Sequence, residues 1–170
     1  RMAARESVVT IGMRGDGDLA MSPNPDVSLL ERIITNQREI IRAETRKQPS
    51  EVPQAWTLYQ EVVEYYNLGM RAPEDVTTML CDDNFGNINR LPERGSDIPS
   101  GGFGVYYHFD LHGGPRSYQW LNTNPIPRIW EQLNLAYSLG VNRIFIVNVG
   151  DLKPMELPIH FFLDFAYRPQ

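Results

Sequence analysis

The feature that most constrains the fold of this 170-residue chain is a set of five short runs rich in β-branched and aromatic residues, separated by segments of helical periodicity. Each run is mostly apolar on both faces, which is typical of strands in a parallel sheet covered by helices. The predicted strands are residues 7–13, 52–58, 76–81, 102–109 and 143–149, and the predicted helices are residues 26–45, 60–68, 127–139 and 155–167. This alternation predicts α/β architecture with right-handed crossovers.

The ends of the predicted helices carry local signals. Ser28 and Glu31 have the spacing of a capping box at the start of the first helix. Gly69 and Gly140 are expected to end the second and third helices. The residues expected to face inward are Leu30, Ile33, Ile34, Ile40 and Ile41 in the first helix, and Ile129, Trp130, Leu133, Ala136 and Tyr137 in the third.

An open doubly wound sheet and a (β/α)8 barrel both fit this alternation. An open sheet would usually carry a glycine-rich phosphate turn, and Gly12-Met13-Arg14-Gly15 fits neither the dinucleotide nor the Walker pattern. A barrel predicts polar residues after every strand, converging on one face, and such residues follow all five runs. A closed barrel typically needs eight strands and ~250 residues. We therefore expect a partial (β/α)8 TIM-type barrel with about five strands, forming a single partial catalytic domain over residues 1–170 whose flanking domains are missing.

Composition narrows the function classes. Apolar residues make up 42% of the chain and charged residues 22%, as in soluble globular proteins. Lys and Arg total 16 against 21 Asp and Glu, for a net charge of -5, and no basic cluster suggests a nucleic-acid partner. No apolar run approaches the ~18 residues of a membrane span, so no membrane partner is expected. The single cysteine, Cys81, excludes an internal disulfide.

Charged residues follow the first two predicted strands. Arg14 could hold a substrate carboxylate in a bidentate fork, and Asp16 and Asp18 could bind hydroxyls or act as a base. A tight solvated turn with an Arg–Asp pair would explain the same residues. Glu61 follows the second strand at the positive end of a helix dipole, where it could act at a barrel mouth or merely complement the dipole.

Acids and amides follow the third strand. Asp82, Asp83 and Asn84 come directly after a buried apolar run and precede a long segment, residues 85–101, without clear structure. Long loops in compact domains are often functional. A capped turn with Asx hydrogen bonds is the alternative interpretation.

The last two strands also end in polar residues. His108 lies among aromatic residues that suit the faces of sugar rings. Asn148 lies at the end of the fifth strand, and Asp151 follows it. His108 and His112 lack the flanking pattern of metal ligands, and a structural histidine is the more usual outcome. Taken together, the polar strand ends favour a hydroxyl-rich ligand that carries a carboxylate.

Glycosidic cleavage needs two carboxyl groups, one of them protonated to release the leaving oxygen. Asp and Glu candidates are plentiful after these strands. A Ser–His–acid triad has no comparable support, and Cys81 lies in an apolar strand where a nucleophile would not be expected. The chemistry therefore points to a carboxylate-based hydrolase.

In this order the motifs resemble the catalytic domain of glycoside hydrolase family 115, the xylan α-glucuronidases, over nearly the whole chain. The matching segments are Gly12-Met13-Arg14-Gly15-Asp16-Gly17-Asp18, Trp56-Thr57-Leu58-Tyr59 with Glu61, Cys81-Asp82-Asp83-Asn84, Tyr106-Tyr107-His108-Phe109-Asp110, Gly113-Gly114-Pro115-Arg116, residues 120–125 and residues 146–156. Phe85 stands where the family leads us to expect tryptophan, and residues 19–26 also differ from the expected pattern.

The resemblance implies an inverting enzyme that removes glucuronic acid, or its 4-O-methyl ether, α-1,2-linked to xylose in glucuronoxylan or its oligosaccharides. It carries over the catalytic residues Glu61, Asp18 and Asp82 and the substrate-binding residues Arg14, Asn84, His108 and Asn148. Glu61 is expected to be the general acid, while Asp18 and Asp82 compete for the base that activates water. No metal or organic cofactor is implied. A secreted or periplasmic location follows from the same resemblance, and a homodimer of the full-length protein is one expectation.

Two other functions compete with the hydrolase. A non-catalytic carbohydrate-binding or regulatory protein could retain the uronic-acid pocket without the chemistry. Cation-dependent sugar chemistry could use Asp16, Asp18, Asp82 and Asp83, although no spacing among them resembles a known cation loop. Because strands expected in a full barrel are absent, the isolated segment is not expected to be active by itself.

Overall fold

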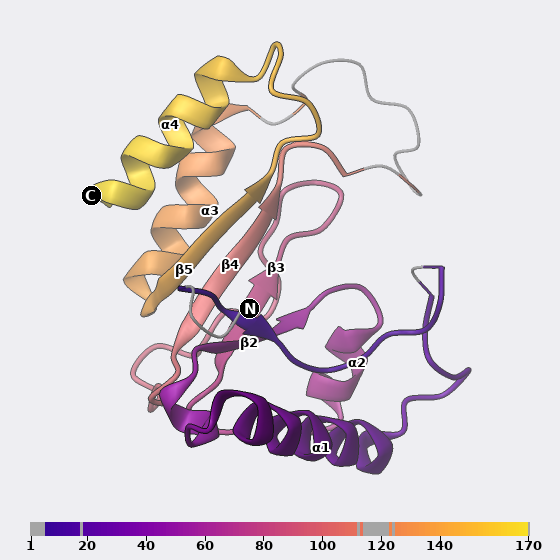
Figure 1. Cartoon of the computed structure of the whole chain (residues 1–170). Helices are drawn as coiled ribbons and strands as arrows, with labels where there is room; N and C mark the ends of the chain where they lie inside the picture. The colour runs from indigo at the N-terminus through magenta and orange to yellow at the C-terminus, as the bar shows by residue number, and fades with distance from the viewer. Residues whose placement is uncertain (1–5, 18, 112, 114–122, 124, 170) are drawn as a thin grey trace. The chain divides into compact units, whose positions relative to one another are not determined.

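The computed structural model describes residues 6–17, 19–111, 113, 123 and 125–169 (Figure 1). The elements in chain order are β1 (Val9–Thr10), α1 (Val27–Thr45), the 3-10 turn η1 (Pro49–Glu51), β2 (Gln54–Leu58), α2 (Val62–Asn67), β3 (Thr77–Cys81), β4 (Phe103–His108), α3 (Ile126–Ser138), β5 (Val141–Asn148) and α4 (Glu156–Tyr167). Every predicted strand and helix is present, with four ends as predicted and the others displaced by one to three residues. The predicted α/β fold is confirmed.

The strands hydrogen-bond in the order in which the chain visits them, β1-β2-β3-β4-β5. β1 runs parallel to β2, and β4 runs parallel to β5 with His108 opposite Asn148. Consecutive winding of this kind is that of a (β/α) barrel, whereas a doubly wound sheet reverses its order at a switch point. The strand order therefore agrees with the predicted partial barrel.

The chain divides into two compact units. The first unit comprises residues up to 79 together with residues 99–102, and the second comprises residues 80–98 and those from 103 onward. Each unit contains its own set of buried apolar side chains.

In the first unit, α1 buries Leu30, Ile34 and Ile41, while Ile40 is 60% exposed despite its predicted inward position. Ile40 lies about 100° around the helix from Ile41, which places it outside the buried stripe. The predicted capping box is also wrong. Asp26 is the N-cap, and its carboxylate accepts hydrogen bonds from the Leu29 amide and the Ser28 hydroxyl.

In the second unit, α3 and α4 lie side by side against the paired strands β4 and β5 (Figure 1). The buried stripe of α3 is formed by Ile129, Gln132, Leu133 and Ala136. Trp130 and Tyr137 were predicted to face inward but are 47% and 39% exposed, because each lies one position beyond a buried residue. α4 buries Pro158, Phe162 and Phe165 but leaves Leu157, Leu163 and Tyr167 exposed.

Glycines end two of the helices as predicted. Gly69 after α2 and Gly140 after α3 have φ values of 95° and 88°, which side chains with a Cβ rarely adopt. The first predicted strand is much shorter than expected because the chain turns at Gly12, where φ is 102°. A Cβ at Gly12 would lie 3.0 Å from Cδ1 of Trp56, so glycine is needed there for both conformation and space.

Candidate active site

The turn after β1 is held to α1 by one side chain. Gln37 accepts a hydrogen bond from the Gly12 amide at 2.7 Å and donates one to the Gly12 carbonyl at 2.9 Å. This two-point contact replaces the ladder bonds that the chain loses where β1 ends. It fixes the starting point of the segment that carries Arg14.

Arg14 forms a bidentate ion pair with Glu61. Its Nε donates to Oε1 at 2.7 Å and its Nη2 donates to Oε2 at 2.8 Å. The guanidinium also donates to Oε1 of Gln60 at 3.0 Å and lies over the ring of Tyr59, 5.1 Å from its centroid. The Arg14 and Glu61 side chains are only 23% and 20% exposed. The first unit thus brings together two of the predicted site residues that are separated by 46 intervening residues of the chain.

The backbone between β2 and α2 aims Glu61. Gln60 has a φ of 48°, a left-handed conformation that is unusual for a residue with a side chain. Such residues cost of the order of 1 kcal/mol or more and cluster at functional sites. Glu61 then occupies the N-cap position of α2. Gln60 and Tyr59 were not among the predicted site residues, although their place directly after a strand was a usable signal.

The ion pair decides the charge of Glu61. The hydrogen bonds from Arg14 lower the pKa of the Glu61 carboxyl below its usual value, outweighing its partial burial. Glu61 is therefore an ionised carboxylate at neutral pH as long as Arg14 holds it. A general acid must carry a proton, so this arrangement cannot donate one without a change at Arg14. Asp18, the predicted base, lies outside the described residues.

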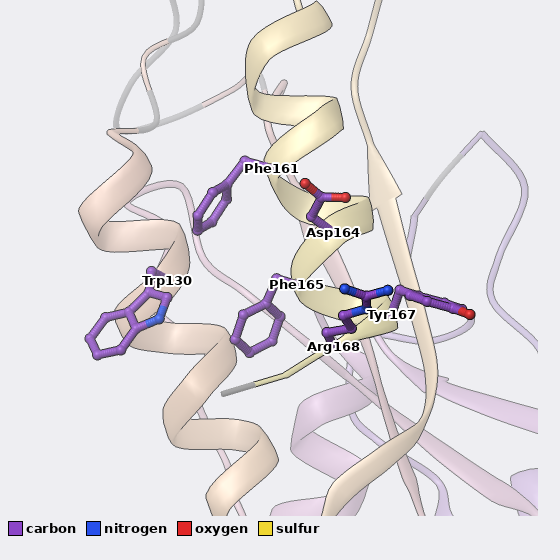
Figure 2. A pocket seen from close by; sticks show the side chains of 6 residues that line it. All are labelled: Trp130, Phe161, Asp164, Phe165, Tyr167 and Arg168. Atoms are coloured by element: carbon purple, nitrogen blue, oxygen red, sulfur yellow. The ribbon is translucent and has the colours of Figure 1, made fainter.

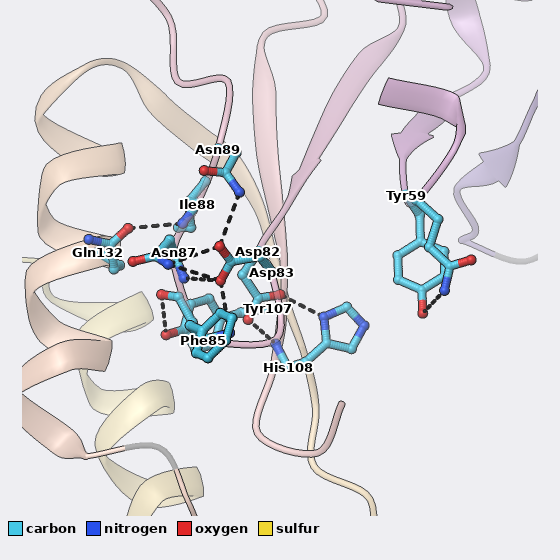
Figure 3. Close-up of polar contacts among 12 residues, drawn as sticks. Tyr59, Asp82, Asp83, Phe85, Asn87, Ile88, Asn89, Tyr107, His108 and Gln132 are labelled. Carbon is cyan, nitrogen blue, oxygen red and sulfur yellow. Dashed lines mark hydrogen bonds and ion pairs between the residues drawn. The ribbon is translucent and has the colours of Figure 1, made fainter. Parts of the chain in front are cut away.

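In the second unit, Asp82 and His108 form a buried pair (Figure 3). Oδ1 of Asp82 lies 2.6 Å from Nδ1 of His108, and Oδ2 accepts a hydrogen bond from the His108 amide at 3.1 Å. Their side chains are 1% and 2% exposed. Burial raises the pKa of Asp82, and the hydrogen bonds from His108 work against that rise. Both oxygens of Asp82 are engaged, which suits a residue that positions His108 better than one that activates water.

The segment after β3 is a turn built around Asp83 (Figure 3). The Asp83 carboxylate accepts hydrogen bonds from the Phe85 amide and from both the amide and the side chain of Asn87, at 2.9 to 3.1 Å. Partial burial opposes ionisation of Asp83, but these hydrogen bonds together lower its pKa. The Asx-turn interpretation holds for Asp83, which leaves Asn84 as the predicted binding residue at the tip of the turn.

Neighbouring elements of the second unit anchor this turn. The Tyr107 hydroxyl donates to the Gly86 carbonyl at 2.9 Å, and Oε1 of Gln132 on α3 accepts from the Ile88 amide at 2.9 Å. Both contacts are buried. Phe85, next to Asn84, is 51% exposed.

Asn148 lies beside His108 in the β4/β5 register. Opposed residues of neighbouring strands project to the same face of a sheet, so the two side chains share a face. Oδ1 of Asn148 accepts from the Gly150 amide at 3.0 Å. The Tyr106 ring, which was not among the predicted site residues, lies 4.3 Å from the His108 ring. The second unit therefore gathers His108, Asp82 and Asn148.

A groove lies between α3 and α4, with a volume of about 640 Å³ (Figure 2). Its lining residues are Trp130, Phe161, Asp164, Phe165, Tyr167 and Arg168. Asp164 is the only carboxylate among these lining residues, and its Oδ2 lies 3.3 Å from Nε2 of His160. The groove is formed by helices rather than by the ends of strands. Its lining residues do not include the pair of carboxyl groups that a glycosidase site needs.

The described part of the chain offers neither a metal-ion cluster nor a membrane-spanning helix. No group of three or more His, Cys, Asp or Glu side chains there could hold a metal ion. None of the described helices has the length and apolar character required to cross a membrane. Cys81 is buried, and burial raises the pKa of its thiol to about 12, so it is not an activated nucleophile.

Comparisons with known proteins add to this geometry. The family model described as Glycosyl hydrolase family 115 matches residues 1–170. A solved structure described as a novel family GH115 4-O-methyl-α-glucuronidase, BtGH115A, with specificity for decorated arabinogalactans, is 38% identical with a TM-score of 0.90. The match covers 97% of this chain and 22% of that one, so the chain spans less than a quarter of its neighbour. No curated protein matches significantly.

Proposed function

The chain belongs to glycosyl hydrolase family 115, and on that premise we propose that the protein removes glucuronic acid, or its 4-O-methyl ether, from a decorated polysaccharide. The observation that carries the proposal is the Arg14–Glu61 pair. An arginine fork suits a uronate carboxylate, and the carboxyl group it now holds suits proton donation to a glycosidic oxygen. The whole polymer-degrading activity is proposed for the full-length protein.

The proposed reaction inverts configuration. Glu61 gives its proton to the glycosidic oxygen as the bond from the sugar C1 to that oxygen breaks, and the bonding electrons stay with the leaving alcohol. A water molecule attacks C1 from the opposite face and loses a proton to a carboxylate base. Asp18 is proposed as that base. Asp82, which is buried and bonded to His108, is proposed to position the histidine.

The remaining predicted residues suit sugar hydroxyls. In the tautomer that donates a hydrogen bond from Nδ1 to Asp82, the acceptor nitrogen of His108 is Nε2. The side chains of Asn84 and Asn148 each offer an acceptor and a donor group. Aromatic rings such as Phe85 and Tyr106 suit the C–H faces of a pyranose. This mixture of amides, an imidazole and aromatic surface favours a polyhydroxylated ligand.

Two polymers are candidates for the substrate. The family resemblance favours glucuronic acid α-1,2-linked to xylose in glucuronoxylan, whereas the solved neighbour is described as specific for decorated arabinogalactans. Incubating the full-length protein with both polymers and quantifying released uronic acid by anion-exchange chromatography discriminates between them. A secreted or periplasmic location and a homodimer remain part of the same proposal.

The role of Glu61 is tested by the Glu61→Gln variant. We expect release from the polymer to fall by at least ~10²-fold, with less effect on an aryl glucuronide whose leaving group needs no proton. NMR should detect the β-anomer first; first appearance of the α-anomer would exclude inversion. Calorimetric binding of glucuronate without any turnover of either polymer would instead favour the non-catalytic carbohydrate-binding alternative.

A further inference from the structure

The Arg14–Glu61 pair poses a chemical conflict at the proposed acid. Proton donation requires Glu61 to be protonated, yet two charge-assisted hydrogen bonds at 2.7 and 2.8 Å stabilise its ionised form. Both side chains are about four-fifths buried, so solvent weakens the pair less than it would on an open surface. Without substrate, the site holds its acid in the inactive charge state.

The proposed substrate carries the group that can resolve this conflict. A uronate carboxylate has the same planar geometry and charge as the Glu61 carboxylate, so it can occupy the same arginine fork. We propose that the substrate's carboxylate takes over the guanidinium of Arg14, and that Glu61, relieved of its counter-charge, takes up a proton from the solvent and then donates it to the glycosidic oxygen. This inference rests on the proposed function and makes Arg14 a determinant of specificity.

The groups around Glu61 make Arg14 its controlling charge. Among the described residues, Arg14 is the cation whose hydrogen bonds and charge lower the pKa of Glu61. Asp16 lies two residues beyond Arg14, and Glu64 lies in the first turn of α2. Both are exposed and both are acidic. Tyr59 lies under the guanidinium rather than on the carboxyl group. Once Arg14 is engaged elsewhere, the partial burial of Glu61 favours its protonated form.

A consequence for substrate choice follows. An otherwise identical neutral α-glucoside would lose more than the binding energy of its missing carboxylate, because Glu61 would remain paired with Arg14 and ionised. Carboxylate recognition would then appear in kcat as well as in KM, which uniform binding alone does not produce.

Calorimetry of glucuronate binding to the full-length protein tests the proposal. Measured at about pH 5.5 in buffers of different ionisation enthalpy, binding should take up roughly half a proton or more per site, because Glu61 is ionised before binding and protonated after it. Glu61→Gln should lose this uptake, since an amide does not titrate. Glucose, which has no carboxylate, should cause no uptake at any concentration that binds.

Arg38 provides a matched control. It forms another buried arginine–carboxylate pair in the same unit, with Nη2 donating to both oxygens of Asp75 at 2.9 and 2.8 Å, and its side chain is 18% exposed. Arg38→Gln should therefore remove a comparable ion pair while leaving proton uptake unchanged. The alkaline limb of the pH profile of kcat/KM reports the pKa of Glu61 in the free protein, and that of kcat reports its pKa in the substrate-bound protein. Arg14→Gln should bring these two limbs closer together by about one pH unit or more.

The outcomes separate this inference from the proposed function. Uptake that depends on Glu61 and survives Arg38→Gln supports the inference. Glucuronate binding with less than about a tenth of a proton taken up, or uptake that persists in Glu61→Gln, overturns it even if the polymer is still hydrolysed. Absence of both glucuronate binding and uronic acid release overturns the proposed function, and the inference with it.

Discussion

Replacing Asp82 with asparagine separates the positioning role of that carboxylate from a role as base. In the native pair, two donors, the Nδ1–H of His108 and its backbone amide, are satisfied by two carboxylate oxygens at 2.6 and 3.1 Å. An asparagine offers one acceptor oxygen and one NH2 group. It must therefore either leave one donor unsatisfied or bond to Nδ1 as a donor, which moves the imidazole proton to Nε2.

The size of the effect follows from the burial of the pair. With the side chains 1% and 2% exposed, water cannot replace the lost acceptor, and an unsatisfied buried donor costs about 1–3 kcal/mol of stability. If the ring changes tautomer instead, the fold keeps its stability but Nε2 becomes a donor towards the substrate. Loss of one hydrogen bond between neutral groups in the bound state, about 0.5–1.5 kcal/mol, corresponds to a loss of roughly 2–13-fold in kcat/KM.

Three measurements on the full-length protein test this reasoning. Urea denaturation gives the change in the free energy of unfolding, steady-state kinetics gives kcat/KM, and ¹⁵N-histidine NMR reports which ring nitrogen of His108 carries the proton. Asp75→Asn, which alters a carboxylate paired with Arg38, is the matched control and should retain the native kcat/KM. Native kcat/KM together with an unchanged tautomer in Asp82→Asn would refute the positioning role.

Three further predictions concern stability and reactivity. The lowered pKa of Glu61 means that its ion pair stabilises the fold above about pH 4.5 and loses that contribution as the pH falls below it. In Glu61→Gln, the free energy of unfolding should therefore fall less on acidification, by about 1 kcal/mol or less. Gly150→Ala should destabilise the fold by about 1–3 kcal/mol, because its Cβ would lie 2.2 Å from Oδ2 of Asp110. Gly17→Ala, with a similar φ of 68° and nothing within 4 Å, should cost less in the same denaturation assay. Cys81, buried with its pKa raised to about 12, should not react with a disulfide reagent until the protein unfolds.

The elements of this fold could be predicted because their signals are local. Apolar runs of four to eight residues and glycines at helix ends depend on neighbouring positions only, and Gly69 and Gly140 end their helices as expected. The errors arose where a choice between adjacent positions was needed. Asp26 rather than Ser28 caps α1. Ile129 and Trp130 were both predicted to face inward, but only Ile129 is buried, because one position along a helix changes the direction by about 100°.

The partners of the site residues could not be predicted in the same way. Arg14 meets Glu61 across 47 positions and Asp82 meets His108 across 26, so their contacts depend on strand register and on the turn conformation at Gln60. The residue types after each strand were informative about ligand chemistry, but not about which charge would neutralise which. That pairing is what changes the interpretation of both carboxylates.

The directions of the two pKa shifts, taken alone, would assign the roles the other way round. Arg14 lowers the pKa of Glu61 while burial raises that of Asp82, and in many hydrolases the carboxyl group with the raised pKa is the acid. Accessibility argues against this reversal, since the Asp82 side chain is 1% exposed with both oxygens bound to His108, whereas Glu61 is 20% exposed. A group that cannot reach the substrate cannot protonate it, whatever its pKa. Glu61 therefore stays the proposed acid, with substrate binding drawing Arg14 away from it.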